Sequence, residues 1–264
     1  MPRANRYFLP GYIWHITHRC HKGEFLLKFA RDQRRWMQWV FEAKKRFGVS
    51  ILNYSVTSNH IHLIMKDAQG RDAIPRTMQL VAGRTGQEYN QRKKRKGAFW
   101  EDRYHATAVE EDVHLGQCML YVDLNMVRAG VVAHPSEWPF CGYHEIQNAR
   151  KRYSLIDYDG LIDLFRIGSR EEFKKIYQGW VAEALDKKSF LERDSRWTDC
   201  IAVGSEGFVR AVKEKLGPKA MWREMAGVNG SYELRETTAA YKPVFDGKKG
   251  GLRQKNAFFW DISI

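Results

Sequence analysis

A short apolar run that carries two histidines, SNHIHLIM at residues 58–65, constrains the fold of this chain more than any other stretch. Its branched side chains after a Ser-Asn turn predict a β-strand. Residues i and i+2 of a strand share a face, so His60 and His62 project in parallel while Ile61 and Leu63 point the other way. Two parallel imidazoles can bind one divalent ion. The alternative is an ordinary strand that carries two hydrogen-bonded polar residues.

The segments around this run alternate between the two periodicities of regular structure. Their order, β-α-β-β-α-β-α, is close to the ferredoxin-like split βαβ pattern. In that fold helices cover one face of an antiparallel sheet, and His60 and His62 lie on a central strand facing the open side. The fold class is therefore α+β, with strands expected at 12–20, 49–56, 60–65 and 104–110 and helices at 29–47, 77–89 and 110–130.

The charge of the chain points to a polyanionic partner. Among 264 residues, 44 lysines and arginines oppose 31 aspartates and glutamates, a formal net charge of +13. Nucleic acid is the usual partner of such a protein. No apolar run approaches the ~20 residues that span a bilayer, and no signal-peptide segment follows the basic N-terminus. We therefore expect a cytoplasmic, nucleoid-associated protein without a membrane partner. Four widely separated cysteines with no CxxC spacing indicate reduced thiols.

The densest basic cluster, QRKKRKG at residues 91–97, is followed directly by Phe99 and Trp100. It forms either a solvated loop or a loop that grips a phosphate backbone. The two aromatic residues can stack on bases or belong to the core. The candidate nucleic-acid-binding residues are Arg92, Lys93, Lys94, Arg95, Lys96, Arg103 and Arg128.

A tyrosine and an asparagine lie one turn apart on the helix expected at 110–130, so their side chains are neighbours. Tyr121 is either a packing residue or a nucleophile. Beside a metal held by two histidines, its phenol suits attack on a phosphodiester, with a covalent phosphotyrosine as the product. The Asn125 amide oxygen is placed to be the third metal ligand beside His60 and His62. Phosphate and oxygen ligands favour Mg²⁺ or Mn²⁺, and the imidazoles shift the preference toward Mn²⁺.

Three ordered motifs in residues 7–145 resemble the single-tyrosine HUH transposases, and most closely the REP-associated tyrosine transposases. They are NHIHL at 59–63, FWEDRY at 99–104 and YVDLNMVRAG at 121–130. The resemblance implies metal-dependent cleavage and joining of single-stranded DNA at hairpins through a 5′-phosphotyrosine. It also implies that His60, His62 and Asn125 hold the metal and that Tyr121 is the nucleophile. One departure is Asn125-Met126, where the family usually has Asn-Pro.

Residues 1–148 are thus expected to form an HUH catalytic domain, and residues 149–264 a mainly helical accessory region. That region either binds hairpins or promotes oligomerisation, or else its helices pack on the core and stabilise it. Capping-box and apolar patterns predict helices beginning near 169 and 205.

The leading hypothesis is an enzyme that nicks and transfers single-stranded or hairpin DNA. A hairpin-binding protein that no longer cleaves is the alternative. A metal-dependent RNA-binding or RNA-cleaving protein fits the charge and fold but leaves Tyr121 unexplained. A monomer is expected, with a homodimer as the other possibility.

Overall fold

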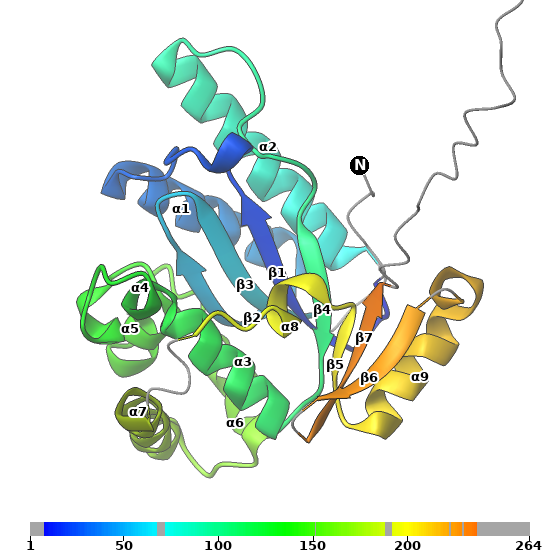
Figure 1. The fold of residues 1–264 in the computed structure, drawn as a ribbon. Coiled ribbons are helices and arrows are strands. Elements are labelled where there is room, and N and C mark those ends of the chain that lie inside the picture. The colour runs from blue at the N-terminus through cyan, green and yellow to red at the C-terminus, as the bar shows by residue number, and fades with distance from the viewer. Residues whose placement is uncertain are drawn as a thin grey trace, which may run out of the picture.

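The structure of the protein is a computed structural model that describes residues 8–67, 72–150, 152–187, 192–221, 223–228 and 230–236. Within these residues the chain forms one seven-stranded sheet with the order β2-β3-β1-β4-β5-β7-β6. Helices lie against both of its faces, and the strands of the C-terminal part extend it at one edge (Figure 1). The strands are β1 (Ile13–Arg19), β2 (Val49–Val56), β3 (His60–Asp67), β4 (His105–Val109), β5 (Ala202–Gly204), β6 (Arg223–Val228) and β7 (Ser231–Glu236).

The first four strands form the antiparallel, ferredoxin-like part of the sheet, which confirms the predicted fold class. β3 is central, between β2 and β1, and β1 pairs with β4 on its other side. Thr17 lies opposite His62 in the β1–β3 register, and His15 lies opposite Ile64. Because paired residues share a face, His15, Thr17 and the two histidines of β3 line the same side of the sheet.

Two long helices cover the apolar side of the sheet. These are α1 (Ala30–Phe47) and α2 (Ala73–Lys93), which pack against each other. Trp36 and Val40 of α1 are completely buried, and Gly48 ends the helix in the left-handed conformation. α2 begins before the expected residue 77 because Pro75 is accommodated in its first turn, where a missing N–H costs little. It also runs through Arg92 and Lys93.

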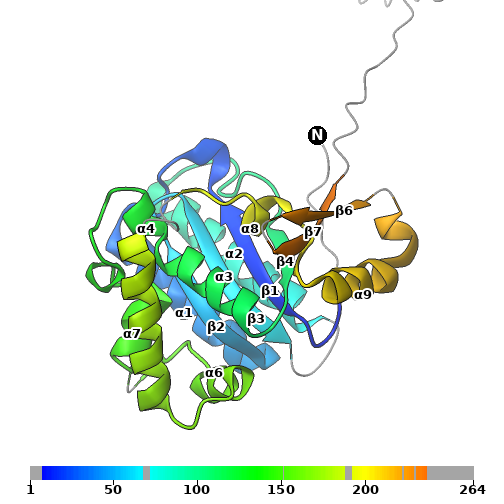
Figure 2. The same ribbon diagram turned by 60° about the horizontal axis from the view of Figure 1, so that its bottom comes forward.

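The histidine side of the sheet, which we expected to be open, carries a third helix. α3 (Val113–Asp123) contacts β2, β3 and β4 on this side, and the single turn α4 (Asn125–Arg128) follows it. Figure 2 shows α3 in front of the strands and α1 behind them. The expected continuous helix is therefore interrupted at Leu124. Val122 and Leu115 are fully buried, so apolar packing against the sheet accounts for its position.

The C-terminal part packs on this core and adds strands that we did not predict. β5 pairs with β4 in parallel, and β7 and β6 follow as an antiparallel hairpin. A three-residue strand such as β5 is too short to show an alternating pattern in the sequence. The strand that it pairs with also lies about 90 residues earlier in the chain. The domain boundary between 148 and 149 stays a prediction. The helices are α5 (Gly142–Gln147), α6 (Tyr158–Phe165), α7 (Arg170–Lys187), α8 (Arg196–Asp199) and α9 (Glu206–Leu216), with 3₁₀ turns at His21–Gly23, Pro135–Glu137 and Gly217–Ala220.

Two expectations from composition can be compared with the described residues. None of the described helices combines the length and apolar character needed to cross a membrane. All four cysteines are buried free thiols. Burial raises the pKa of the Cys118 and Cys141 thiols well above their ordinary value, so they are packing residues.

Candidate functional site

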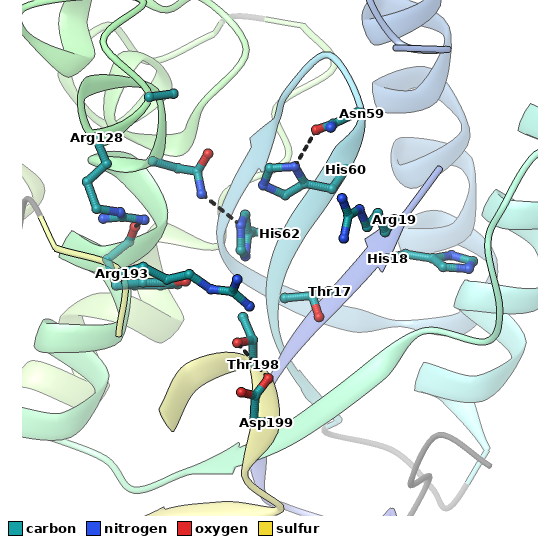
Figure 3. A pocket seen from close by; sticks show the side chains of 13 residues that line it. Thr17, His18, Arg19, Asn59, His60, His62, Arg128, Arg193, Thr198 and Asp199 are labelled. Atoms are coloured by element: carbon teal, nitrogen blue, oxygen red, sulfur yellow. Dashed lines mark hydrogen bonds between the residues drawn. The ribbon is translucent and has the colours of Figure 1, made fainter. Parts of the chain in front are cut away.

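A pocket of about 530 Å³ lies on the histidine side of the sheet. Its walls come from β1, from β3 and the turn before it, from the α3–α4 corner, and from α8 and the segment that leads into it, and Figure 3 shows the side chains converging on it. Segments far apart in the sequence therefore form one site. The lining residues are Thr17, His18, Arg19, Asn59, His60, His62, Tyr121, Asn125, Arg128, Ala129, Arg193, Thr198 and Asp199.

The two histidines of β3 face this pocket as the strand alternation predicts. Their ring centroids are 5.0 Å apart and their planes are nearly perpendicular. The Nδ1 atom of His60 lies 2.7 Å from Asn59 Oδ1 and 2.9 Å from Thr57 Oγ1. The Nδ1 atom of His62 lies 2.9 Å from Nε2 of His15. Both imidazoles are thus held through Nδ1, which leaves Nε2 as the atom for a ligand.

Asn125 joins the histidines at the beginning of α4. Its Nδ2 lies 3.0 Å from Nε2 of His62, and its side chain also hydrogen-bonds to His60. Rotation of an amide by 180° exchanges its oxygen and nitrogen at little steric cost. Asn125 can therefore present its oxygen to whatever lies between the two rings. The structure brings together the three residues predicted to hold a metal.

Tyr121 lies on the last turn of α3, beside His62. The two ring centroids are 5.8 Å apart in an edge-to-face arrangement, and only 4% of the residue is exposed. The Arg128 guanidinium covers the other part of the phenol ring, 4.1 Å from its centroid, and donates a hydrogen bond to the Tyr121 carbonyl oxygen at 2.7 Å. This stacking fixes the direction of the tyrosine side chain relative to the two histidines.

The pKa values at this site follow from burial among arginines. Burial, and then the charges of Arg19 and Arg128, lower the pKa of His60 to about 4, and burial lowers that of His62 well below its ordinary value. Both rings are therefore neutral near pH 7, the state in which imidazole binds a metal. Burial raises the pKa of Tyr121, while the charges of Arg128 and Arg193 act to lower it.

The donor set fits a divalent cation that keeps part of its coordination for water or phosphate. Two neutral imidazoles and one amide supply three donors, and Mn²⁺ or Mg²⁺ accepts six. The ranges that the structure describes contain no group of three His, Cys, Asp or Glu side chains arranged to hold a metal. A site at His60, His62 and Asn125 would thus depend on further ligands from the substrate or solvent.

The other predicted nucleic-acid-binding residues do not line the pocket. Arg92 at the end of α2 forms an ion pair with Asp32 and lies over the Tyr89 ring. Arg95 donates to the carbonyl oxygen of Ala98 at 2.8 Å and so holds its own turn. Arg103 is exposed, as are Lys93 and Lys94. Of the seven, only Arg128 reaches the candidate site, and the role of the others stays a prediction.

Sequence reasoning missed the arginines and polar residues that the remaining walls contribute. Arg19 is the last residue of β1, on the same strand face as Thr17, so strand alternation could have identified it. Arg193, Thr198 and Asp199 belong to the C-terminal part. Figure 3 shows Arg193 extending into the pocket. Nothing in the local sequence connects residues 193–199 with β3, because their contact depends on the docking of α8 beside β4.

His18 is a structural residue. The His18 ring stacks on Trp100 with centroids 4.1 Å apart and donates through Nε2 to the Asp102 carbonyl oxygen at 2.8 Å. His18 is 5% exposed. The Phe99 side chain is also buried, so these aromatic residues pack in the core at the end of the sheet.

Residues 11–125 match the family model described as "Transposase IS200 like". One similar solved structure is that of a REP-associated tyrosine transposase bound to a REP hairpin. It has 18% sequence identity and a TM-score of 0.48, and the match covers 60% of this chain and 92% of that one. Another, from Deinococcus radiodurans R1 and described as a transposase, has 12% identity, a TM-score of 0.33 and coverage of 49% and 92%. No curated protein matches the chain.

Proposed function

We propose that this protein nicks and joins single-stranded DNA at hairpins through a 5′-phosphotyrosine, in keeping with the match of its residues 11–125 to the model of IS200-like transposases. The observation that carries the proposal is the convergence of Tyr121, His60, His62 and Asn125 on one pocket. The two histidines come from β3, and the other two residues come from α3 and α4, about 60 residues later in the sequence. The net charge of +13 supports a DNA partner.

In the proposed reaction the Tyr121 oxygen attacks the phosphorus of a phosphodiester. A bond forms between that oxygen and phosphorus, and the bond from phosphorus to the 3′ oxygen of the preceding nucleotide breaks. The phenol loses one proton and the departing 3′ oxygen gains one, so the released strand ends in a 3′-hydroxyl. Attack of a 3′-hydroxyl on the phosphotyrosine reverses these steps and joins two ends. The energy of the broken bond is retained in the protein–DNA link.

The pocket residues have separate parts in this scheme. His60, His62 and Asn125 would hold a divalent cation, Mn²⁺ or Mg²⁺, which supplies Lewis-acid polarisation of the phosphate when bound. Arg128 and Arg193 favour the phenolate of Tyr121 against the effect of burial. Arg19 adds a third positive charge to the pocket wall. Guanidinium groups in this position can also bind the non-bridging oxygens of the phosphodiester.

A second candidate is a hairpin-binding protein that does not cleave. The low exposure of Tyr121, 4%, favours it, because a nucleophile must reach phosphorus. The arginines that line the pocket, Arg19, Arg128 and Arg193, would then bind DNA without covalent chemistry. The two candidates differ in one observable, the protein–DNA link.

Incubation with single-stranded hairpin DNA and Mn²⁺ or Mg²⁺, followed by a denaturing gel, tests the proposal. We expect a slower protein–DNA band that is lost in Tyr121→Phe, while the variant still binds the hairpin. Tyr153→Phe is the matched control, because Tyr153 is 66% exposed and packs on Phe41 rather than lining the pocket. Tight hairpin binding with no such band under either metal would establish the non-cleaving candidate instead.

A further inference from the structure

A buried histidine that touches neither the pocket nor solvent lies directly behind the candidate metal site. His15, on β1, is 0% exposed. Its Nε2 is 2.9 Å from Nδ1 of His62, and the planes of the two rings are parallel to within 7°. Its Nδ1 is 2.8 Å from the carbonyl oxygen of Trp197. The three groups form a line from the C-terminal part of the chain to the pocket.

The chemistry of this line allows one arrangement of protons. A carbonyl oxygen only accepts, so Nδ1 of His15 carries the hydrogen. Complete burial keeps the ring neutral, which leaves a lone pair on its Nε2. Nδ1 of His62 must then carry a hydrogen and donate it to His15. The lone pair of His62 is consequently on Nε2, the atom that faces the pocket.

The contact with Asn125 agrees with this tautomer of His62. Its amide nitrogen lies 3.0 Å from Nε2 of His62, and an amide N–H₂ only donates. Nε2 of His62 therefore accepts. The contact with His15 requires the proton on Nδ1 of His62, and the contact with Asn125 in this amide orientation is compatible with it.

We propose that His15 is a positioning residue, which fixes the ring direction and tautomer of His62 and is itself held by the Trp197 carbonyl oxygen. The inference rests on the proposed function, in which His62 binds the metal. Metal-ligating histidines generally need an acceptor for their second ring nitrogen, and loss of that acceptor typically costs 10- to 100-fold in metal affinity. Here the acceptor is a second imidazole, and its orientation depends on residues 197–200.

The segment that supplies the Trp197 carbonyl is itself firmly attached to the sheet. Trp197 is 1% exposed, and Thr107 of β4 donates to the carbonyl oxygens of Trp197 at 3.3 Å and Cys200 at 2.7 Å. Residues 201–203 then pair with β4. The C-terminal part therefore contributes to the site, because the orientation of His62 depends on the Trp197 carbonyl oxygen through His15.

The first measurement is the tautomer of His62 in the metal-free, full-length wild-type protein, by ¹⁵N–¹H correlation spectroscopy of the imidazoles. We expect hydrogen on Nδ1 and a bare Nε2 for both His62 and His15. Hydrogen on Nε2 of His62 would overturn the proposal. This measurement needs no variant and no metal, so it tests the proton arrangement of His62 and His15 even if the proposed function fails.

The second measurement is Mn²⁺ affinity without DNA, from the electron paramagnetic resonance signal of free Mn²⁺. We expect His15→Leu to weaken binding about 10- to 100-fold. His15→Gln should stay within a few-fold of the wild type, since its amide oxygen can accept from His62. His114→Leu is the control, because this histidine of α3 pairs with Glu110 and does not line the pocket.

The possible results separate the two proposals. Wild-type affinity in His15→Leu, or equal losses in His15→Leu and His15→Gln, would refute the positioning role. If His15→Leu does not fold, the glutamine variant and the wild-type tautomer still decide. If the wild-type protein has the expected tautomer but binds no Mn²⁺, the contact between His15 and His62 is supported and the metal-dependent function is contradicted.

Discussion

Replacing glycine by alanine should destabilise the protein at Gly142, which packs against Asn53, and stabilise it at Gly179. Gly142 opens α5, and a Cβ atom added there would lie 1.7 Å from Oδ1 and 2.9 Å from Cγ of Asn53. Nonbonded heavy atoms sit roughly 3.5 Å apart. The Asn53 side chain must therefore move by more than its hydrogen bonds allow. Gly179, inside α7, is exposed, and a Cβ added there meets nothing within 4 Å.

The loss of stability in Gly142→Ala can be worked out from the hydrogen bonds that Asn53 makes. Its Oδ1 accepts from the Tyr54 N–H at 2.7 Å, and its Nδ2 donates to Asp123 Oδ2 at 2.9 Å and to the Met119 carbonyl oxygen at 3.2 Å. Each buried hydrogen bond contributes about 1 kcal/mol. We therefore expect Gly142→Ala to lower the free energy of unfolding by about 3 kcal/mol. Gly179→Ala should raise it by roughly 0.5 to 1 kcal/mol, because alanine loses less backbone entropy in a helix.

Urea unfolding followed by tryptophan fluorescence measures both variants against the wild type. The nine tryptophans supply the signal. Equal midpoints for the two variants, or a stabilised Gly142→Ala, would refute the packing argument. Since Asp123 lies in the same helix as Tyr121, the rate of adduct formation should also fall in Gly142→Ala and stay unchanged in Gly179→Ala.

Three further predictions concern the site and its support. Glu145 is fully buried and accepts from the Tyr54 hydroxyl and from the N–H groups of Leu155 and Ile156. We expect Glu145→Leu to lower the free energy of unfolding by about 3 kcal/mol, and Glu145→Gln by less, in urea unfolding. Arg128→Lys removes the stacking on Tyr121 and should slow single-turnover adduct formation about 100-fold on gels; an unchanged rate would exclude Arg128 from the chemistry. Chelation of divalent metal should abolish the adduct and leave hairpin binding in gel shifts, with recovery on adding Mn²⁺; adduct formation that persists in chelator would contradict the metal-dependent scheme.

Local sequence determined the core of this protein because its signals act over a few residues. Alternation placed His60 and His62 on one strand face, and the helical stripe with Gly48 at its end defined α1. The spacing between Tyr121 and Asn125 predicted that they would be neighbours, and both line the pocket although Leu124 separates α3 from α4. In each case the i+2 or i+4 periodicity of the backbone carries the information.

Only the tertiary structure decided which distant groups complete the site. β5 consists of only three residues, Ala202–Gly204. Its pairing with β4 therefore depends on the whole sheet rather than on a local preference for strand. That pairing brings Trp197 to His15 and Arg193 to the pocket. Loop closure over about 90 residues costs entropy that local patterns do not encode, and burial of Trp197 and the strand hydrogen bonds of β5 offset it. The chain's own pattern thus predicts the candidate site residues, while their orientation depends on long-range contacts that exist only in the folded protein.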